Sequence, residues 1–278
     1  MCGVPEIREA AEQFSELKQE LYAKHPEAQH EATALSNSIV DPAKADAETV
    51  WSVLWPKPLY SGKQVEVSES WYEQLKPNMA GVWRQMHYDH GPYEIRKSTA
   101  PCRTGKRNAP SFVPVGPEIT ALKLRVTAPP QSYYAMVGAA MALNVVAKTS
   151  NRPFAHLPTE ITVDTIKSLQ AEFGYGWGHI TVMHFLTDMG VCCKPDRHLL
   201  NTMKALGLYS KDPQKTPTLL QALEVYRLVK EILIQIEGSI TPRGLRELDK
   251  NLMDISVYEL ITPLPKKARR SKRGHVVS

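Results

Sequence analysis

The sequence has few cysteines, and none of them is spaced to hold a metal. The four are Cys2, Cys102 and the adjacent pair Cys192 and Cys193. Zinc and iron–sulfur sites generally use pairs of cysteines separated by two residues, a spacing that does not occur here. Adjacent cysteines also do not readily bond to each other, because the intervening peptide would be strained. We therefore interpret all four as reduced packing residues and expect no metal site and no cofactor.

Long apolar runs are also lacking. The longest candidate, YYAMVGAAMALNVVA at 133–147, is interrupted by Asn144 and is shorter than the roughly 18 residues that a membrane-spanning helix needs. The N-terminal segment is acidic and amphipathic rather than basic and then apolar, which is not the pattern of a secretory signal. We expect an intracellular protein without a membrane segment.

Excess positive charge is confined to one end of the chain. The net charge is +5, and KKARRSKR at 266–273 contributes six positive charges, so the rest sums to about −1. Such a tail is interpreted as a solvated terminus, as an arm that binds a phosphate backbone, or as a targeting signal. The remaining composition, with 42% hydrophobic and 23% charged residues, is typical of a globular protein.

Helical periodicity runs through most of the chain, so we expect an all-α fold. One segment, ALKLRVTA at 121–128, alternates apolar and polar residues and is a candidate strand. Thr216-Pro217 and Thr241-Pro242 each place a helix cap before a proline. The predicted helices outside the central region are 5–24, 46–55, 68–87 with a break near Pro77, 131–148, about 217–236, and 242–254.

The region from 160 to 207 has the clearest punctuation. Apolar residues recur at helical spacing in three successive stretches, which predicts three helices. Gly174 follows the first helix, Gly190 supplies a left-handed stop for the second, and Gly207 ends the third. Asp196 precedes the third helix and is a natural N-cap.

Between the first two of these helices, the segment GYGWG places glycines at Gly174, Gly176 and Gly178. Residues without a β-carbon can adopt positive φ and turn backbone N–H groups outward at the start of the next helix. Together with the helix dipole, those N–H groups can bind a phosphate oxygen. Because only backbone atoms take part, such a seat does not distinguish one base from another.

The segment GWGHIT at 176–181 resembles the helix-hairpin-helix motif. The following KPD, with Asp196 opening LLNTMKALGL, resembles the catalytic segment of the helix-hairpin-helix superfamily of DNA glycosylases. The resemblance covers about 155–256 and includes LRELDKNLMDIS as a closing helix. Upstream it fades, because the interval 149–160 is too short for the helices that the family places there.

The resemblance implies a two-lobed helical fold and a set of site residues. Asp196 would act at the sugar, and the hairpin would grip the DNA backbone, with a monovalent cation bound there in many members. The bifunctional branch has a nucleophilic lysine where this chain has Ile180, which implies a monofunctional enzyme. The expected backbone contacts are Gly174, Gly176, Gly178, His179, Thr181 and Lys194.

The chemistry fits a carboxylate at this position. Breaking a bond between base and sugar passes through an oxocarbenium-like sugar, which a carboxylate stabilises while it orients or deprotonates water. Lys194 is interpreted as a phosphate contact or a solvated charge. An extruded base needs an aromatic pocket, for which Trp83 and Tyr88 are candidates. His179 and His184 lack a third ligand at a recognisable spacing, so no metal is expected.

We therefore predict a monomeric, DNA-associated DNA glycosylase that acts on duplex DNA with a flipped base. The target is either a damaged base, as in repair, or a non-standard base in viral DNA, as in antiviral defence. The alternatives are a non-catalytic helix-hairpin-helix DNA-binding protein and a helical interaction protein with only a tight glycine turn. The expected domains are a substrate-reading region at 1–130, a glycosylase core at 131–260 and a basic tail at 261–278.

Overall fold

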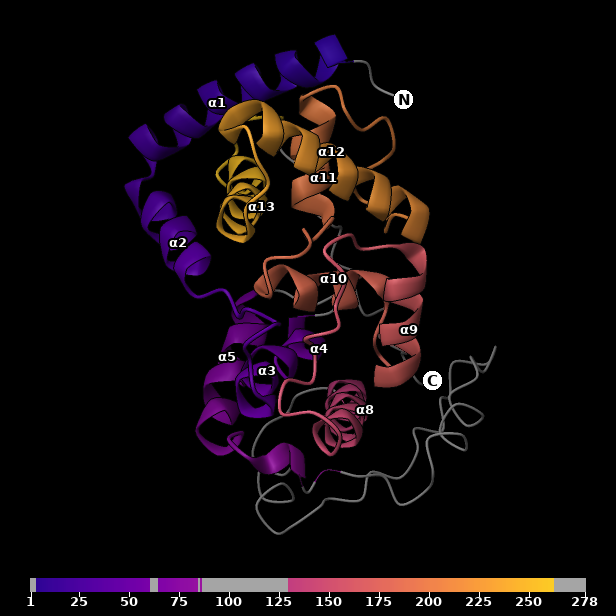
Figure 1. Cartoon of the computed structure of the whole chain (residues 1–278). Coiled ribbons are helices and arrows are strands. Elements are labelled where there is room, and N and C mark those ends of the chain that lie inside the picture. Colours follow the sequence, from indigo (N-terminus) through magenta and orange to yellow (C-terminus); the bar gives the residue numbers. More distant parts are fainter. Residues whose placement is uncertain (1–3, 61–64, 85, 87–129, 263–278) are drawn as a thin grey trace, which may run out of the picture.

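The computed structural model describes residues 4–60, 65–84, 86 and 130–262 (Figure 1). All regular structure within these ranges is helical, which confirms the all-α prediction. The candidate strand at 121–128, Tyr88 and the basic tail at 266–273 lie outside the described residues. Within the ranges that are described, no helix is both long enough and apolar enough to cross a membrane.

The helices form two groups that meet at α10 (Figure 1). Each group contains helices from both sides of residue 130. The first group consists of α1 (Val4–Lys24), α2 (Pro26–Asn37), α11 (Arg197–Ala205), α12 (Leu219–Glu237) and α13 (Pro242–Val257). The second consists of α3 (Ala47–Leu54), α4 (Lys57–Tyr60), α5 (Val65–Leu75), α8 (Pro130–Ala147), α9 (Val163–Phe173), α10 (His179–Asp188) and the 3-10 helices η1 (Lys76–Asn78) and η2 (Val82–Arg84).

Helix α13 is the centre of the first group. It packs against α2 on one side and α11 on the other, while α1 crosses α12 and α13. Leu245, Leu248, Leu252 and Ile255 recur at helical spacing and are buried, which is why this segment folds as a helix with a core-facing stripe. Thr241 caps the helix by accepting a hydrogen bond from the Gly244 N–H, as the sequence predicts.

In the second group, α8 is covered by α3, α4, α9 and η2. Every residue from Ala135 to Ala140 is buried, so this part of the helix is covered on all sides, whereas Val145 near its end is exposed. A cluster of aromatic rings formed by Phe154, Phe173 and Phe185 joins the loop after α8 to α9 and α10. The described core is one continuous cluster through both groups.

One predicted helix start is wrong. Helix α12 begins at Leu219 and is capped by Thr218, not by Thr216. The Thr218 side chain accepts from the Gln221 N–H, and the Gln221 side chain accepts from the Thr218 N–H. This reciprocal capping box provides acceptors for two backbone N–H groups, those of Thr218 and Gln221. A helix that began at Pro217 with Thr216 as its cap could not form these two hydrogen bonds.

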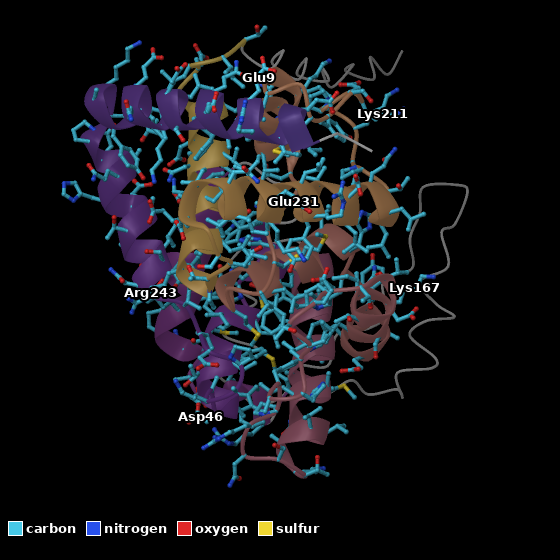
Figure 2. The ribbon with its side chains drawn as sticks, turned by 45° about the horizontal axis from the view of Figure 1, so that its top comes forward. Glu9, Asp46, Lys167, Lys211, Glu231 and Arg243 are labelled. Atoms are coloured by element: carbon cyan, nitrogen blue, oxygen red, sulfur yellow. The ribbon has the colours of Figure 1, made fainter. Side chains whose placement is uncertain are left out.

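Charged side chains cover the outside of the molecule. Lys167, Lys211 and Arg243, labelled in Figure 2, are exposed and extend away from the ribbon. Only a few charged side chains are buried in the described part of the chain, and they are Lys57, Arg246, Asp249 and Asp254.

Candidate functional site

The glycine turn, residues 174–178, joins α9 to α10 in a tight bend. Gly174 and Gly176 have φ values of 78° and 85°, the left-handed region that favours glycine. Gly178 differs, because its φ of −66° and ψ of 160° are open to any residue. Only two of the three glycines are therefore required by backbone conformation.

Gly178 is the N-cap of α10, and the helix start is open in front of it. The first helical hydrogen bond runs from the Val182 N–H to the Gly178 carbonyl, 3.0 Å. The N–H groups of residues 179–181 therefore have no acceptor further back in the helix. A β-carbon added at Gly178 would meet no atom within 4 Å. The space directly in front of Gly178 at the start of α10 is therefore open.

The turn is anchored from inside. Trp177 is buried, and its indole N–H donates to the carbonyl of Ala135 in α8, 2.8 Å. The Gln170 side chain donates to the carbonyl of Trp177, 3.1 Å. The Trp177 ring also lies 4.6 Å from that of Phe173. These contacts hold the backbone of the turn in one conformation.

The other predicted hairpin residues are more enclosed than the glycines. His179 Nε2 lies 2.8 Å from the carbonyl oxygen of Pro217, to which it donates when that nitrogen carries the proton. Thr181 is only 7% exposed, so the part of it that faces the open helix start is its backbone N–H. Ile180 packs against the core.

The Asp196 loop, residues 191–196, connects α10 to α11 and is held at several points. The Val191 N–H donates to the Leu186 carbonyl, and the Val191 carbonyl accepts from the hydroxyl of Tyr226 in α12, 2.9 Å. Cys192 and Cys193 are fully buried reduced thiols, as predicted, and burial raises the pKa of both.

Asp196 itself caps α11 and remains partly open to solvent. Its Oδ1 accepts from the backbone N–H groups of His198 and Leu199, at 3.0 and 3.2 Å. Its Oδ2 lies 3.3 Å from the Lys194 ammonium, and both side chains are 20% exposed. The capping prediction is confirmed. One oxygen is fixed by the backbone, so the orientation of the other is fixed as well.

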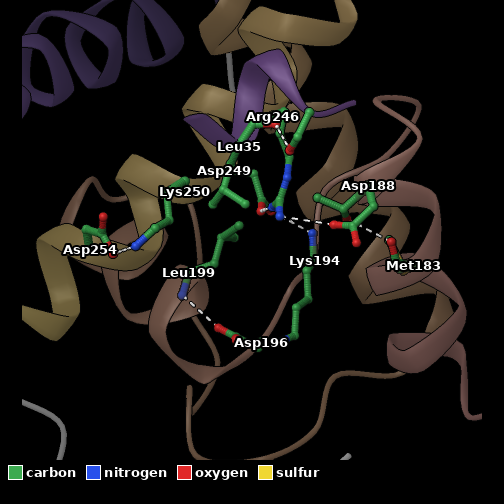
Figure 3. A network of polar contacts seen from close by, with 12 residues as sticks. Leu35, Met183, Asp188, Lys194, Asp196, Leu199, Arg246, Asp249, Lys250 and Asp254 are labelled. Carbon is green, nitrogen blue, oxygen red and sulfur yellow. Dashed lines mark hydrogen bonds and ion pairs between the residues drawn. The ribbon is translucent and has the colours of Figure 1, made fainter. Parts of the chain in front are cut away.

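A largely buried charge network links Lys57, Asp188, Arg246 and Asp249. Figure 3 shows three of these residues, Asp188, Arg246 and Asp249, close to Lys194. Asp249 Oδ2 accepts from Arg246 at 3.0 Å, and Arg246 also donates to Asp188 Oδ1 at 3.0 Å. Asp188 in turn pairs with Lys57. The network joins α4, the last residue of α10 and α13.

The network reaches the Asp196 loop through a backbone bond. The Lys194 N–H donates to Asp249 Oδ1, 2.7 Å, and Asp249 is 0% exposed. Burial raises the pKa of Asp249 to about 6, against the opposing effect of Arg246. Burial also lowers the pKa of Lys57 and of His184 in α10, and the positive charge of Lys194 adds to the effect on both.

The predicted site residues therefore fall into separate places. The structure brings Lys194 and Asp196 together and opens the helix start at Gly178. Trp83 is 3% exposed between α3 and α8, where its indole N–H donates to Glu48 and its carbonyl accepts from Asn144. In the described part of the chain, no three His, Cys, Asp or Glu side chains are grouped to hold a metal.

The sequence pattern did not identify Asp249 and its partners as site residues. A signal was present, since Asp249 follows Leu245 by four residues and precedes Leu252 by three, which places a charge on the apolar stripe of α13. A charged residue at such a position needs a buried partner.

No family model, curated protein or solved structure matches this chain.

Proposed function

We propose that this protein is a monofunctional DNA glycosylase, with Asp196 as its catalytic carboxylate. The observation that carries the proposal is the state of that carboxylate. Asp196 has one oxygen held by two backbone N–H groups and the other beside Lys194, and its side chain still reaches solvent. Ser, Thr or Asn would also cap α11, so the cap alone does not call for a second carboxylate oxygen beside Lys194.

The reaction divides between the sugar and water. The bond between base and sugar breaks, and the base leaves with the electron pair and takes up a proton from solvent water. The positive charge that develops on the sugar is stabilised by the Asp196 carboxylate. Water then adds to the anomeric carbon and gives a proton to the carboxylate, which returns it to solvent. The product is an abasic site. Lys194 keeps the carboxylate oriented until substrate arrives.

Binding of DNA would rest on backbone contacts. The open N–H groups at the start of α10 suit a phosphate oxygen, since they combine unpaired donors with the positive end of the helix dipole. Lys194 adds a cation close to the reacting sugar, and the chain carries six more positive charges at 266–273. The partner is duplex DNA from which one base is flipped out. A protein of this kind is DNA-associated in the cell.

A non-catalytic DNA-binding protein is the second candidate, and one observation favours it. The Oδ1 atom of Asp196 already has a structural role, because it caps α11 with two hydrogen bonds. In that reading the glycine turn binds the backbone and the carboxylate does no chemistry.

Release of a base from DNA distinguishes the two. The full chain would be incubated with duplexes that carry alkylated, oxidised or deaminated bases and with viral DNA that contains modified cytosine. Products would be identified by mass spectrometry. A free base together with an abasic site supports the glycosylase and names the substrate class. Tight binding to all duplexes with no base released from any of them supports the non-catalytic protein.

A further inference from the structure

We propose that Asp249 is a positioning residue, which sets the place of the Asp196 carboxylate by holding the backbone of Lys194. The inference rests on the proposed function, since it assigns a second residue to the same reaction. Asp249 does not touch the reacting atoms. It acts through the peptide that leads into the cap of α11.

The geometry is specific. Both oxygens of the Asp249 carboxylate are engaged, Oδ1 by the Lys194 N–H and Oδ2 by Arg246. The Asp196 N–H donates back to the Lys194 carbonyl, 2.7 Å, so the peptide groups on both sides of Pro195 are fixed. A shift of Lys194 would therefore move the catalytic carboxylate directly.

Packing alone would not select an aspartate here. Position 249 lies on the apolar stripe of α13, where a leucine would fill similar space without the cost of burying a charge. A leucine would, however, leave the Lys194 N–H without its acceptor and Arg246 with only Asp188 on its other side. The buried carboxylate is thus suited to fixing the loop rather than to filling the core.

The network also reaches the helix that begins at the glycine turn. Arg246 joins Asp249 to Asp188, the last residue of α10. The Asp196 loop and α10 are therefore held in one frame with α13 (Figure 3). The sugar-facing carboxylate and the phosphate-binding helix keep a fixed relation because both are tied to α13.

The test compares three variants of the full chain. Asp249→Leu removes the acceptor, whereas Asp249→Asn keeps an oxygen for the Lys194 N–H and loses the charge. Asp254→Asn is the matched control, because Asp254 is also a buried carboxylate of α13, but it pairs with Lys250 instead of the loop. Three readouts are taken: hydrogen exchange at the Lys194 amide, the single-turnover rate of base release, and the Kd for DNA.

Asp249→Leu should speed exchange at Lys194 by about 10-fold or more, since a buried hydrogen bond is lost. The rate of base release should fall by about 100-fold at unchanged Kd, as expected for a small misplacement of a catalytic group. Asp249→Asn should lie between wild type and Asp249→Leu. Asp254→Asn should change none of the three readouts.

The inference fails if exchange at Lys194 stays slow in Asp249→Leu, or if exchange rises while the rate of base release does not fall. An equal loss of rate in Asp254→Asn also overturns it, because a general effect of removing a buried charge would then suffice. If Asp249→Leu does not fold, the comparison of Asp249→Asn with Asp254→Asn decides. Failure of the proposed function is separate: wild type would release no base, while hydrogen exchange would still report whether Asp249 holds the loop.

Discussion

The backbone N–H of Lys194 donates a 2.7 Å hydrogen bond to the buried carboxylate of Asp249, 55 residues further along the chain. This bond joins the loop in front of α11 to the interior of α13. Two residues after Lys194, Asp196 presents a carboxylate with one oxygen fixed and the other beside an ammonium. The candidate site is therefore shaped by tertiary contacts as much as by its own short motif.

The glycine turn leads to a prediction about DNA affinity. Gly178→Thr should weaken binding to all duplexes by about 10-fold, which corresponds to the loss of one charge-assisted hydrogen bond. The threonine side chain would stand in front of the open N–H groups and accept from them itself. Binding would be measured by fluorescence anisotropy with duplexes of unrelated sequence.

This substitution should not strain the backbone, because a threonine at another helix start of this protein already has the same backbone conformation. Thr218 caps α12 with φ −65° and ψ 163°, close to the −66° and 160° of Gly178, and space at position 178 is open. The melting temperature should stay unchanged. The slope of log Kd against log salt should also stay unchanged, because no cation is removed. If the affinity fell for only one duplex sequence, the prediction that these N–H groups bind only the DNA backbone would be contradicted.

Asp249 predicts a pH dependence of stability. Burial raises its pKa from 3.8 to about 6, so between these values the folded protein keeps a proton that the unfolded chain has released. The stability due to this proton is complete below about pH 4 and is lost as pH rises through about 6. The Asp249→Asn variant cannot bind this proton. The difference in unfolding free energy between wild type and this variant should therefore shrink from acid to neutral pH.

Urea unfolding of both proteins at about pH 4, 5 and 7 measures this difference. Exposed carboxylates whose pKa is lowered, such as Asp41 and Asp46, lose stability in acid in both proteins, and their effect cancels in the comparison. A difference in unfolding free energy that stays constant with pH would show that Asp249 does not titrate in this range.

Absence of a covalent intermediate is the next expectation. Ile180 packs against the core and has no nucleophile, and the Lys194 side chain is engaged by Asp196. Borohydride should therefore trap no complex between the protein and a DNA from which it releases a base. A trapped band that disappears in Lys194→Gln would make Lys194 a nucleophile and the enzyme bifunctional.

Much of the fold follows from local sequence signals. The apolar stripes of α9, α10 and α11 are buried as expected, and Gly190 and Gly207 have positive φ where the sequence predicts helix ends. Helix α2 was missed because the residues it buries, Ala28, Ala32 and Ser36, are small and give a weak apolar pattern. These small residues allow α2 to pack closely against α13, and a contact between distant segments cannot be predicted from the local pattern.

The site was predictable only in part for the same reason. Asp196 could be identified as a cap, whereas Lys194 was interpreted as a phosphate contact or a solvated charge, and its pairing with Asp196 was not predicted. The hydrogen bond from Lys194 to Asp249 could not, since it joins distant segments whose relative placement the local pattern does not fix. The division of helices between the two groups has the same origin, because α1 and α2 pack on helices near the other end of the chain.

The central claim is that the Asp196 carboxylate does chemistry, and Asp196→Asn tests it most directly. Asparagine also caps helices well, so the melting temperature and the Kd for DNA should stay close to those of wild type. The single-turnover rate of base release would be followed by mass spectrometry on a duplex from which wild type releases a base. It should fall by about 1,000-fold or more, as for loss of a general base that also stabilises charge. Base release at the wild-type rate, or a loss of rate fully explained by unfolding, would contradict the account.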